Sequence, residues 1–287
     1  MSEMIFESFD ASNRVDVRVY REISELGSKH TISCEVERGF WVVGGGATGS
    51  RNPGGLLTAS FPRADRRAWT ASSTDHVFPD NYKLTCYAIG ISIAGFSPDE
   101  LLKNHLRYDS STGPKAAHPE ASAQVPITEG FTLIGGGFQV NGPKNLATAS
   151  YPEFDQEWTA RSKDHGGYVA PTTITSWAIS IRKKMIPEGT EGTTETVTVD
   201  VASAGLLSPL AEQMQSDVLL PRGYALTGAG AEVRYDEPGL LLWQIQPFKE
   251  NLSPKRIRVS AGAKDHGDVA MGTLKTWAIG IAVSPPL

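Results

Sequence analysis

Three adjacent aspartate–histidine pairs are the residues of this sequence whose types best suit chemistry. The pairs are Asp75-His76, Asp164-His165 and Asp265-His266. A carboxylate accepts hydrogen bonds from hydroxyl groups, and a neutral imidazole both donates and accepts them, so each pair suits a polyol such as a sugar. The alternative is structural: the aspartate closes an Asx turn on the backbone and the histidine packs beside it. Neighbouring strand residues point to opposite faces, so a catalytic pairing requires that the pair lie in a turn.

Two tryptophans stand six residues before two of these aspartates. Trp69 follows Arg66-Arg67-Ala68, and Trp158 follows Gln156-Glu157. These flanking residues are charged, polar or small, which allows an exposed indole that stacks on the apolar face of a sugar ring. Core packing is the alternative for both side chains. The predicted ligand-binding residues are therefore Asp75, His76, Asp164, His165, Asp265, His266, Trp69 and Trp158, and the second set, which has both the tryptophan and a glycine-rich turn, is expected to bind best.

Other chemistry finds little support in the sequence. No serine-centred elbow, HExxH or CxxC motif accompanies the pairs, so no catalytic residue, metal ligand or cofactor is predicted. The glycine clusters described below are not followed by Lys-Ser or Lys-Thr or by a helix, which disfavours a nucleotide site. Cys34 and Cys86 are the two cysteines. We expect buried free thiols, although a bridge would form in an oxidising setting if the two lay on adjacent strands.

Charge and hydropathy exclude further classes of partner. The formal net charge is -5 and no basic block stands out, which disfavours nucleic acid and anionic lipid. The first ten residues, MSEMIFESFD, do not resemble a secretory signal, and no apolar stretch has the length of a transmembrane helix. The sequence predicts a cytoplasmic location by default and leaves non-classical release open.

A pattern that occurs three times organises the chain. Each copy has a Gly-aromatic pair five residues before a glycine cluster, then a proline, an Asp-His pair and a closing apolar segment. The clusters are Gly44-Gly45-Gly46, Gly135-Gly136-Gly137 and Gly228-Ala229-Gly230, the prolines are Pro62, Pro152 and Pro247, and Val259 stands in the third copy where the others have tryptophan. We expect a single all-β domain over 1–287 built of three repeats, at about 8–95, 96–186 and 187–287.

The closing segments alternate large and tiny residues, as a half-buried strand does. Tyr87-Ala88-Ile89-Gly90-Ile91 has counterparts that begin at Trp177 and Trp277. A glycine cluster within a strand marks a close approach of another backbone, so three clusters suit three sheets that converge on one axis. The sequence thus predicts an all-β, β-prism-like fold with pseudo-threefold symmetry, and weak helices only at 98–105 and 206–214.

The repeat resembles a module of bacterial, especially actinobacterial, proteins. The residues that carry the resemblance are Gly44 to Gly46, Ser60 to Pro62, Trp69 and Tyr87 to Ile91, with their counterparts in the second copy. That module has no assigned activity, so the resemblance implies the β-repeat fold and no function.

Three functions are weighed on these grounds. The first is a non-enzymatic, multivalent carbohydrate-binding (lectin-like) protein, because three like sites turn weak sugar binding into useful avidity. The second is a structural or interaction protein, such as a toxin component or an assembly subunit, whose partner is another protein. The third is a hydrolase, which is disfavoured because no copy holds a cluster of titratable groups that the others lack. The oligomeric state is left open.

Overall fold

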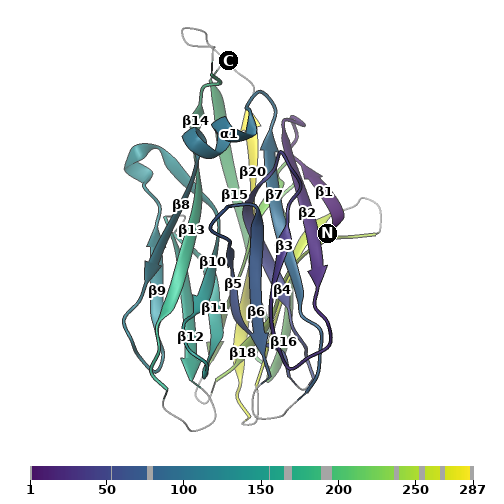
Figure 1. Ribbon diagram of the computed structural model, residues 1–287, viewed down its shortest axis with the longest axis vertical. Coiled ribbons are helices and arrows are strands. Elements are labelled where there is room, and N and C mark those ends of the chain that lie inside the picture. Colours follow the sequence, from purple (N-terminus) through teal and green to yellow (C-terminus); the bar gives the residue numbers. More distant parts are fainter. Residues whose placement is uncertain are drawn as a thin grey trace.

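The computed structural model describes residues 2–52, 54–75, 80–154, 156–164, 170–188, 196–235, 239–251, 256–265 and 269–284. Nearly all of its regular structure is β-strand (Figure 1). A short helix α1 (Pro98–Glu100) runs into a π-helical turn (Leu101–His105), and a 3-10 turn spans Ile127–Glu129. The helix predicted at 98–105 is confirmed. The one predicted at 206–214 is wrong, because β15 continues to Leu207 and β16 begins at Gln213.

Each repeat supplies six strands in the same order, which we call strands a to f. In repeat 1 they are β2 (Val15–Ile23), β3 (Lys29–Glu35), β4 (Trp41–Thr48), β5 (Leu56–Pro62), β6 (Ala68–Thr74) and β7 (Thr85–Ile93). In repeat 2 they are β8 (Leu106–Thr112), β9 (Glu120–Gln124), β10 (Phe131–Val140), β11 (Asn145–Glu153), β12 (Glu157–Asp164) and β13 (Ile174–Arg182). In repeat 3 they are β15 (Val197–Leu207), β16 (Gln213–Leu219), β17 (Ala225–Tyr235), β18 (Leu241–Lys249), β19 (Ile257–Lys264) and β20 (Gly272–Ser284).

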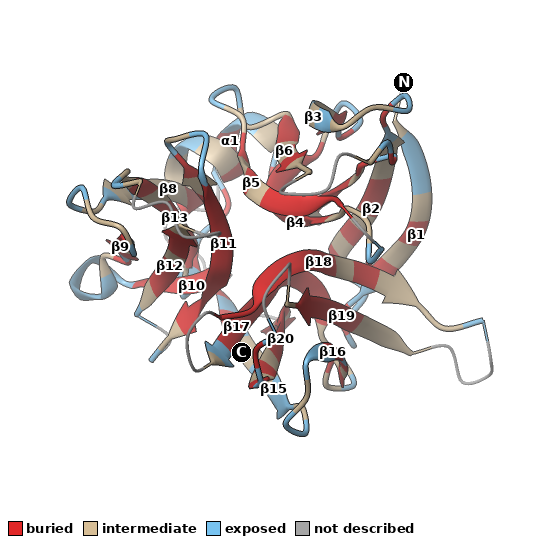
Figure 2. Ribbon diagram, turned by 90° about the horizontal axis from the view of Figure 1, so that it is seen from below, coloured by how far each residue is buried: buried red, intermediate tan, exposed pale blue. Residues whose placement is uncertain are grey.

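The strands form three antiparallel sheets, and each sheet is shared by two repeats. The orders are β1-β2-β7-β4-β18-β19-β16 in sheet 1, β3-β6-β5-β10-β13-β8 in sheet 2 and β14-β15-β20-β17-β11-β12-β9 in sheet 3. Each sheet therefore joins strands a, f and c of one repeat to strands d, e and b of the preceding repeat in cyclic order. The additional strands β1 (Glu3–Phe9) and β14 (Lys184–Met185) lie at two sheet edges. Figure 2 shows the three sheets arranged around a common centre, an architecture compatible with a β-prism.

The glycine clusters meet at this centre. A Cβ on Gly44 would lie 2.2 Å from the carbonyl oxygen of Thr227, and one on Gly135 would lie 2.2 Å from that of Val43. A Cβ on Gly228 would lie 2.8 Å from the carbonyl oxygen of Ile134. The first glycine of each cluster therefore rests on the backbone of a neighbouring repeat, in a closed ring of three contacts. These contacts confirm the predicted convergence of the clusters. A side chain at any of these positions would separate the sheets.

The closing strands pack as their alternation predicts. Ile89 and Ile91 are buried, and so are their counterparts Ile179, Ile181, Ile279 and Ile281. At one end of the molecule, Leu56, Leu146 and Leu241, one from each repeat, form an apolar cluster with Trp243. We call this the lower end; it is at the bottom of Figure 1 and carries the c–d, e–f and a–b connections of all three repeats.

Candidate functional site

The three predicted aspartates all lie at the lower end, where strand e of each repeat ends. Their backbone N–H groups make the same contact, each donating to a carbonyl of its own a–b connection. The bonds run from Asp75 to Ser28 (2.8 Å), from Asp164 to Ala117 (3.1 Å) and from Asp265 to Glu212 (3.1 Å). Their partners His76, His165 and His266 lie outside the described residues, so the pairing of carboxylate and imidazole stays a prediction.

The carboxylate of Asp164 is engaged by the protein itself. Its Oδ2 accepts a hydrogen bond of 3.0 Å from the backbone N–H of Ala170, and its Oδ1 lies 3.2 Å from Nε2 of His118. These contacts fit the structural interpretation, in which the aspartate closes its turn on the backbone. The sequence analysis missed His118, which lies in the a–b connection of repeat 2 and has no motif around it.

The aspartate of repeat 3 has a different environment. Burial raises the pKa of Asp265, and the nearby carboxylate of Glu212 adds to the rise. The three turns therefore share a backbone arrangement while the surroundings of their carboxylates differ.

Trp69 and Trp158 are both fully buried, so the prediction that they expose a stacking face is wrong. Their indole N–H groups donate to the hydroxyls of Ser60 (2.7 Å) and Ser150 (2.8 Å). The central glycine of each cluster makes the room: a Cβ on Gly45 would lie 2.5 Å from the Trp69 ring. The charged neighbours do not indicate exposure of the indoles, because adjacent strand residues face opposite sides.

The residue before each aspartate distinguishes the repeats more clearly. Strand pairing aligns Thr74, Lys163 and Lys264, which lie opposite Leu56, Leu146 and Leu241. Both lysines are almost completely buried, at 2% and 3% exposed. They reach from their own repeat to the c–d hairpin of the next repeat in cyclic order. Each of these two lower junctions is therefore filled by an ammonium-bearing side chain.

Lys264 shows what the buried ammonium does. Its Nζ donates to the carbonyl oxygen of Arg51 at 2.6 Å, and burial lowers its pKa to about 8 against the opposing effect of Asp265 and Asp80. In the second repeat, Nζ of Lys163 lies 5.1 Å from the centre of the Tyr235 ring, the distance of a cation–π contact.

The shorter side chain of Thr74 leaves the first of these junctions open. Here a hollow of about 360 Å³ lies between strand e of repeat 1 and the c–d hairpin of repeat 2. We call it the lower hollow. Its wall carries hydroxyl, amide and ammonium groups from four strands of sheet 2, and Gly142 and Pro143 close it on the hairpin side. The polar residues that line it are Lys29, His30, Thr31, Thr58, Ser72, Ser73, Thr74 and Gln139.

The lower hollow continues past the hairpin. A second depression of about 460 Å³ shares Gly142 and Pro143 with it and is lined by Lys115, Asn141 and Thr173, among others. Hydroxyl pairs run across the strands of this sheet, Thr31 to Ser72 at 2.9 Å and Thr112 to Thr175 at 2.8 Å. This part of the surface offers many neutral donors and acceptors at fixed spacing.

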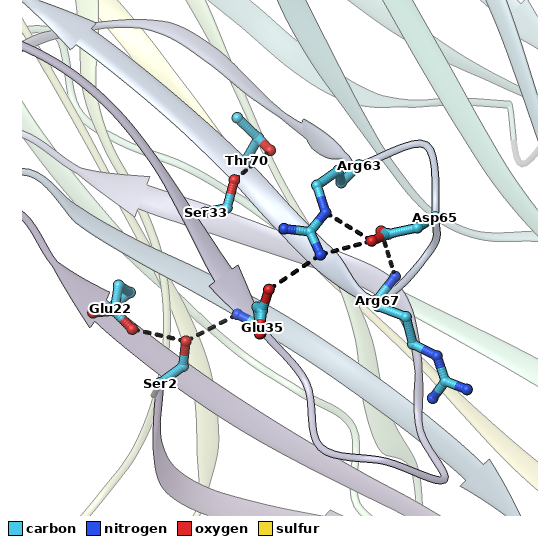
Figure 3. A network of polar contacts seen from close by, with 8 residues as sticks. All are labelled: Ser2, Glu22, Ser33, Glu35, Arg63, Asp65, Arg67 and Thr70. Carbon is cyan, nitrogen blue, oxygen red and sulfur yellow. Dashed lines mark hydrogen bonds and ion pairs between the residues drawn. The ribbon is translucent and has the colours of Figure 1, made fainter.

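At the opposite end of the same sheet, ion pairs join the strands in addition to hydroxyl groups. The guanidinium of Arg63 binds Asp65 at 2.6 Å and Glu35 at 3.1 Å, and Asp65 also accepts from the backbone N–H of Arg67 (Figure 3). This network fixes the d–e turn of repeat 1. Its groups satisfy one another, so we assign it a structural role.

The thiols and titratable clusters offer no reactive centre in the part of the chain that the structure describes. Cys34 and Cys86 are free and buried, and burial raises the pKa of Cys34 to about 12. No three His, Cys, Asp or Glu side chains of these residues lie where they could hold a metal ion. The described helical segments include none with the length and apolarity needed to cross a membrane.

Comparisons with protein-family models and with curated proteins found no match to the chain. The resemblance to the bacterial β-repeat module therefore stays a prediction, and the site has to be interpreted from its own geometry.

Proposed function

We propose that this chain is a non-enzymatic carbohydrate-binding protein and that the lower hollow holds the sugar. The supporting observation is a solvent-accessible hollow lined by hydroxyl and amide groups at a place where the other two repeats bury a lysine. Serine, threonine and glutamine side chains both donate and accept, which matches the hydroxyls of a sugar. Val140 and Pro143 supply an apolar wall for the carbon face of the ring.

The position of the hollow also explains why its polar groups stay available. In repeat 3 the ammonium of Lys264 already satisfies a carbonyl of the neighbouring hairpin. In repeat 1, Thr74 is too short to span the gap and instead donates to the carbonyl of Asp75 at 2.9 Å. A ligand hydroxyl in the lower hollow would take the place of the missing ammonium.

The test restores the lysine. A Thr74→Lys variant should fill the lower hollow and abolish binding in a titration of sugars and polysaccharides. Thr198→Lys adds the same charge at an exposed position on sheet 3, away from the lower hollow, and should leave binding intact. Equal loss in both variants, or undiminished binding in Thr74→Lys, would contradict the location.

The number of bound sugars separates this site from the Asp-His turns. The lower hollow predicts one sugar per chain, whereas the three turns predict up to three. The double change Asp164→Ala and His165→Ala should leave binding unchanged if the hollow is the site, and should weaken it if the turn of repeat 2 is the site. No binding by the intact protein across a broad panel would remove the carbohydrate proposal altogether.

One observation favours the second function, a protein-interaction role. Several large apolar side chains of repeat 3 are exposed around its lower end. Here Ala211 of the a–b connection pairs with Gly272 at the start of β20. The exposed side chains are Leu206 (51%), Leu207 (50%), Leu210 (64%), Val269 (70%) and Met271 (41%). A grouping of this kind is typical of a surface that another protein covers. Sedimentation of Leu210→Asp beside the parent chain tests self-association as its cause.

We propose also that the three repeats are related by an approximate threefold axis through the ring of glycines. Support comes from the identical cyclic strand order and from bulges at the same place in each c–f pair, at Val42/Gly44, Leu133/Gly135 and Leu226/Gly228. Superposition of the repeats in an experimental structure tests it.

A further inference from the structure

The upper end of the molecule has a second set of junctions, which the carbohydrate proposal does not involve. Here the b–c connection and the d–e turn of one repeat meet strand a of the next. Between repeats 1 and 2 the junction is filled by the protein. The Tyr108 hydroxyl donates to the carbonyl of Val42 at 2.6 Å, and the guanidinium of Arg66 stacks 4.5 Å above the Tyr108 ring. An aromatic ring and a planar group above it thus close this junction.

The same place between repeats 2 and 3 lacks both groups. Strand pairing sets Tyr108 opposite Ile179 and Ser203 opposite Ile279, so a serine replaces the tyrosine. The d–e turn changes too: Arg66 has a φ of +62° and Phe154 a φ of +51°, so Phe154 is the left-handed residue of the second turn. A serine thus stands in place of the tyrosine. Arg67 and Gln156 correspond, since their carbonyls accept from Val36 and Val125, so Phe154 lies one position before the counterpart of Arg66.

A hollow of about 520 Å³ results, which we call the upper hollow. Ile127, Phe131, Val199 and Val201 line it with apolar surface, and Thr132, Gln156, Lys183, Asp200 and Ser203 with polar groups. Phe154 stands at its wall with 83% of its surface exposed. A phenylalanine in the left-handed region is strained, and an exposed one gains nothing from burial. A planar ligand group packed against the Phe154 ring would stabilise the side chain in that conformation.

The third upper junction, between repeats 3 and 1, has an extra strand. Val19 corresponds to Tyr108, since it lies opposite Ile89, and β1 pairs beside it through Phe6. A smaller hollow of about 310 Å³ lies here, lined by Phe9 of β1 and by Tyr224 and Arg256 of repeat 3, among others.

We propose that the upper hollow binds a phenolic ring in the place that Tyr108 fills at the first junction, with the exposed Phe154 of the hollow's wall stacked on it. The carbonyl of Leu133 corresponds to that of Val42 in strand pairing and accepts the phenol hydroxyl. Apolar side chains on the hollow's wall surround the ring, and offset or edge-to-face contact with Phe154 adds selectivity for a planar group.

The probe is p-cresol, the side chain of tyrosine, titrated into isotope-labelled protein while the backbone amide resonances of Thr132 and Ser203 are followed. We expect saturable shifts with a Kd on the order of 1 mM. The control ligand is 4-methylcyclohexanol, which has the same length and hydroxyl but no planar ring. It should bind about three- to tenfold more weakly. Equal binding of both compounds would show an apolar hollow without aromatic selectivity and would overturn the proposal.

Three variants test the location. Ser203→Tyr rebuilds the side chain of the first junction, so it should abolish p-cresol binding. Phe154→Ala should weaken binding about three- to tenfold. Phe9→Ala, which removes another exposed phenylalanine at 43% exposure, should not change it. Undiminished binding in Ser203→Tyr, or an absence of saturable shifts in the parent protein, would sink the proposal.

The reciprocal change supplies a gain of function. Tyr108→Ser should open the first upper junction beneath Arg66 and create a second p-cresol site. Should this variant fail to fold, Ser203→Tyr and Phe154→Ala still decide the matter, because both lie at the hollow's surface. A folded Tyr108→Ser protein that binds only one p-cresol would contradict the claim that the two junctions are equivalent.

Discussion

Repeats 1 and 3 carry different residues at equivalent positions, both inside the protein and at its surface. Inside, repeat 1 packs Trp69 against Gly45 and bonds it to Ser60. Strand pairing places Val259, Ala229 and Ile245 at the corresponding positions of repeat 3. The smaller Val259 leaves room for the methyl group of Ala229, and Ile245 removes the hydroxyl that the indole satisfied.

At the lower end the two repeats also differ, but no neighbouring residue that the structure describes fills the space. Thr74 takes the place of Lys264 in strand pairing, and the lower hollow remains. Close packing constrains a buried position, so a substitution there requires compensating substitutions in the residues around it. An exposed junction carries no such requirement. We therefore propose the uncompensated difference between the repeats, rather than the repeated motif, as the first place to test for binding.

The largest effect on stability should come from disrupting the packing of Trp69, Gly45 and Ser60 in repeat 1. Trp69→Ala removes a fully buried indole and leaves the Ser60 hydroxyl without its donor, so we expect a loss of about 3–5 kcal/mol in the free energy of unfolding. Val259→Ala, the matched change in repeat 3, should cost about 2 kcal/mol, because only two methyl groups are lost. Urea denaturation measures both. Equal losses would contradict the different packing of the two repeats.

A smaller effect should follow from the glycine alone. Gly45→Ala places a Cβ 2.4 Å from the carbonyl oxygen of Tyr87 and 2.5 Å from the Trp69 ring, so overpacking should cost about 1–3 kcal/mol. The reverse change, Ala229→Gly, should cost about 0.5–1 kcal/mol.

Transplanting the whole set into repeat 1 sharpens this comparison. A triple variant, Gly45→Ala with Trp69→Val and Ser60→Ile, should be more stable than Gly45→Ala alone in the same denaturation measurement. A triple variant less stable than the single one would show that the three positions are not coupled.

The last effect is comparable in size with those of the glycine changes, concerns the lower junction and depends on pH. The folded pKa of Lys264 is lowered to about 8, below its unfolded value. Between these two values the unfolded chain binds more protons than the folded one, so this lysine adds stability as pH rises. From about pH 7.5 to about 9.5 the gain should be on the order of 1–2 kcal/mol.

Lys264→Met should remove that gain, measured as the difference in pH profile between variant and parent. Lys103→Met, at an exposed position near the opposite end, serves as the control and should follow the parent. A variant at Lys264 whose profile runs parallel to the parent would contradict the effect of burial on this ammonium.

The strands that could be predicted were those whose own residues define both faces. Ile89 and Gly90 alternate within one strand. The glycine clusters indicate the close approach of another backbone but do not identify which one. The sharing of sheets could not be predicted, because repeats with equivalent residues pair equally well within one copy or between copies. The polar wall of the lower hollow was missed for a related reason. Thr31, Ser72 and Gln139 come from three strands far apart in the chain and form no motif.

The shared sheets also set the order in which the molecule can be completed. Strand β4 of the first repeat finds its outer neighbour only in β18 of the third, which begins at Leu241. While the chain is being synthesised, the edge of β4 stays open until most of the protein has left the ribosome. An open edge of apolar, glycine-rich strand invites pairing with other chains, and such long-range closure is slow. Rapid synthesis of the last repeat, or a chaperone that covers β4 meanwhile, would therefore govern how much of this protein reaches its native state.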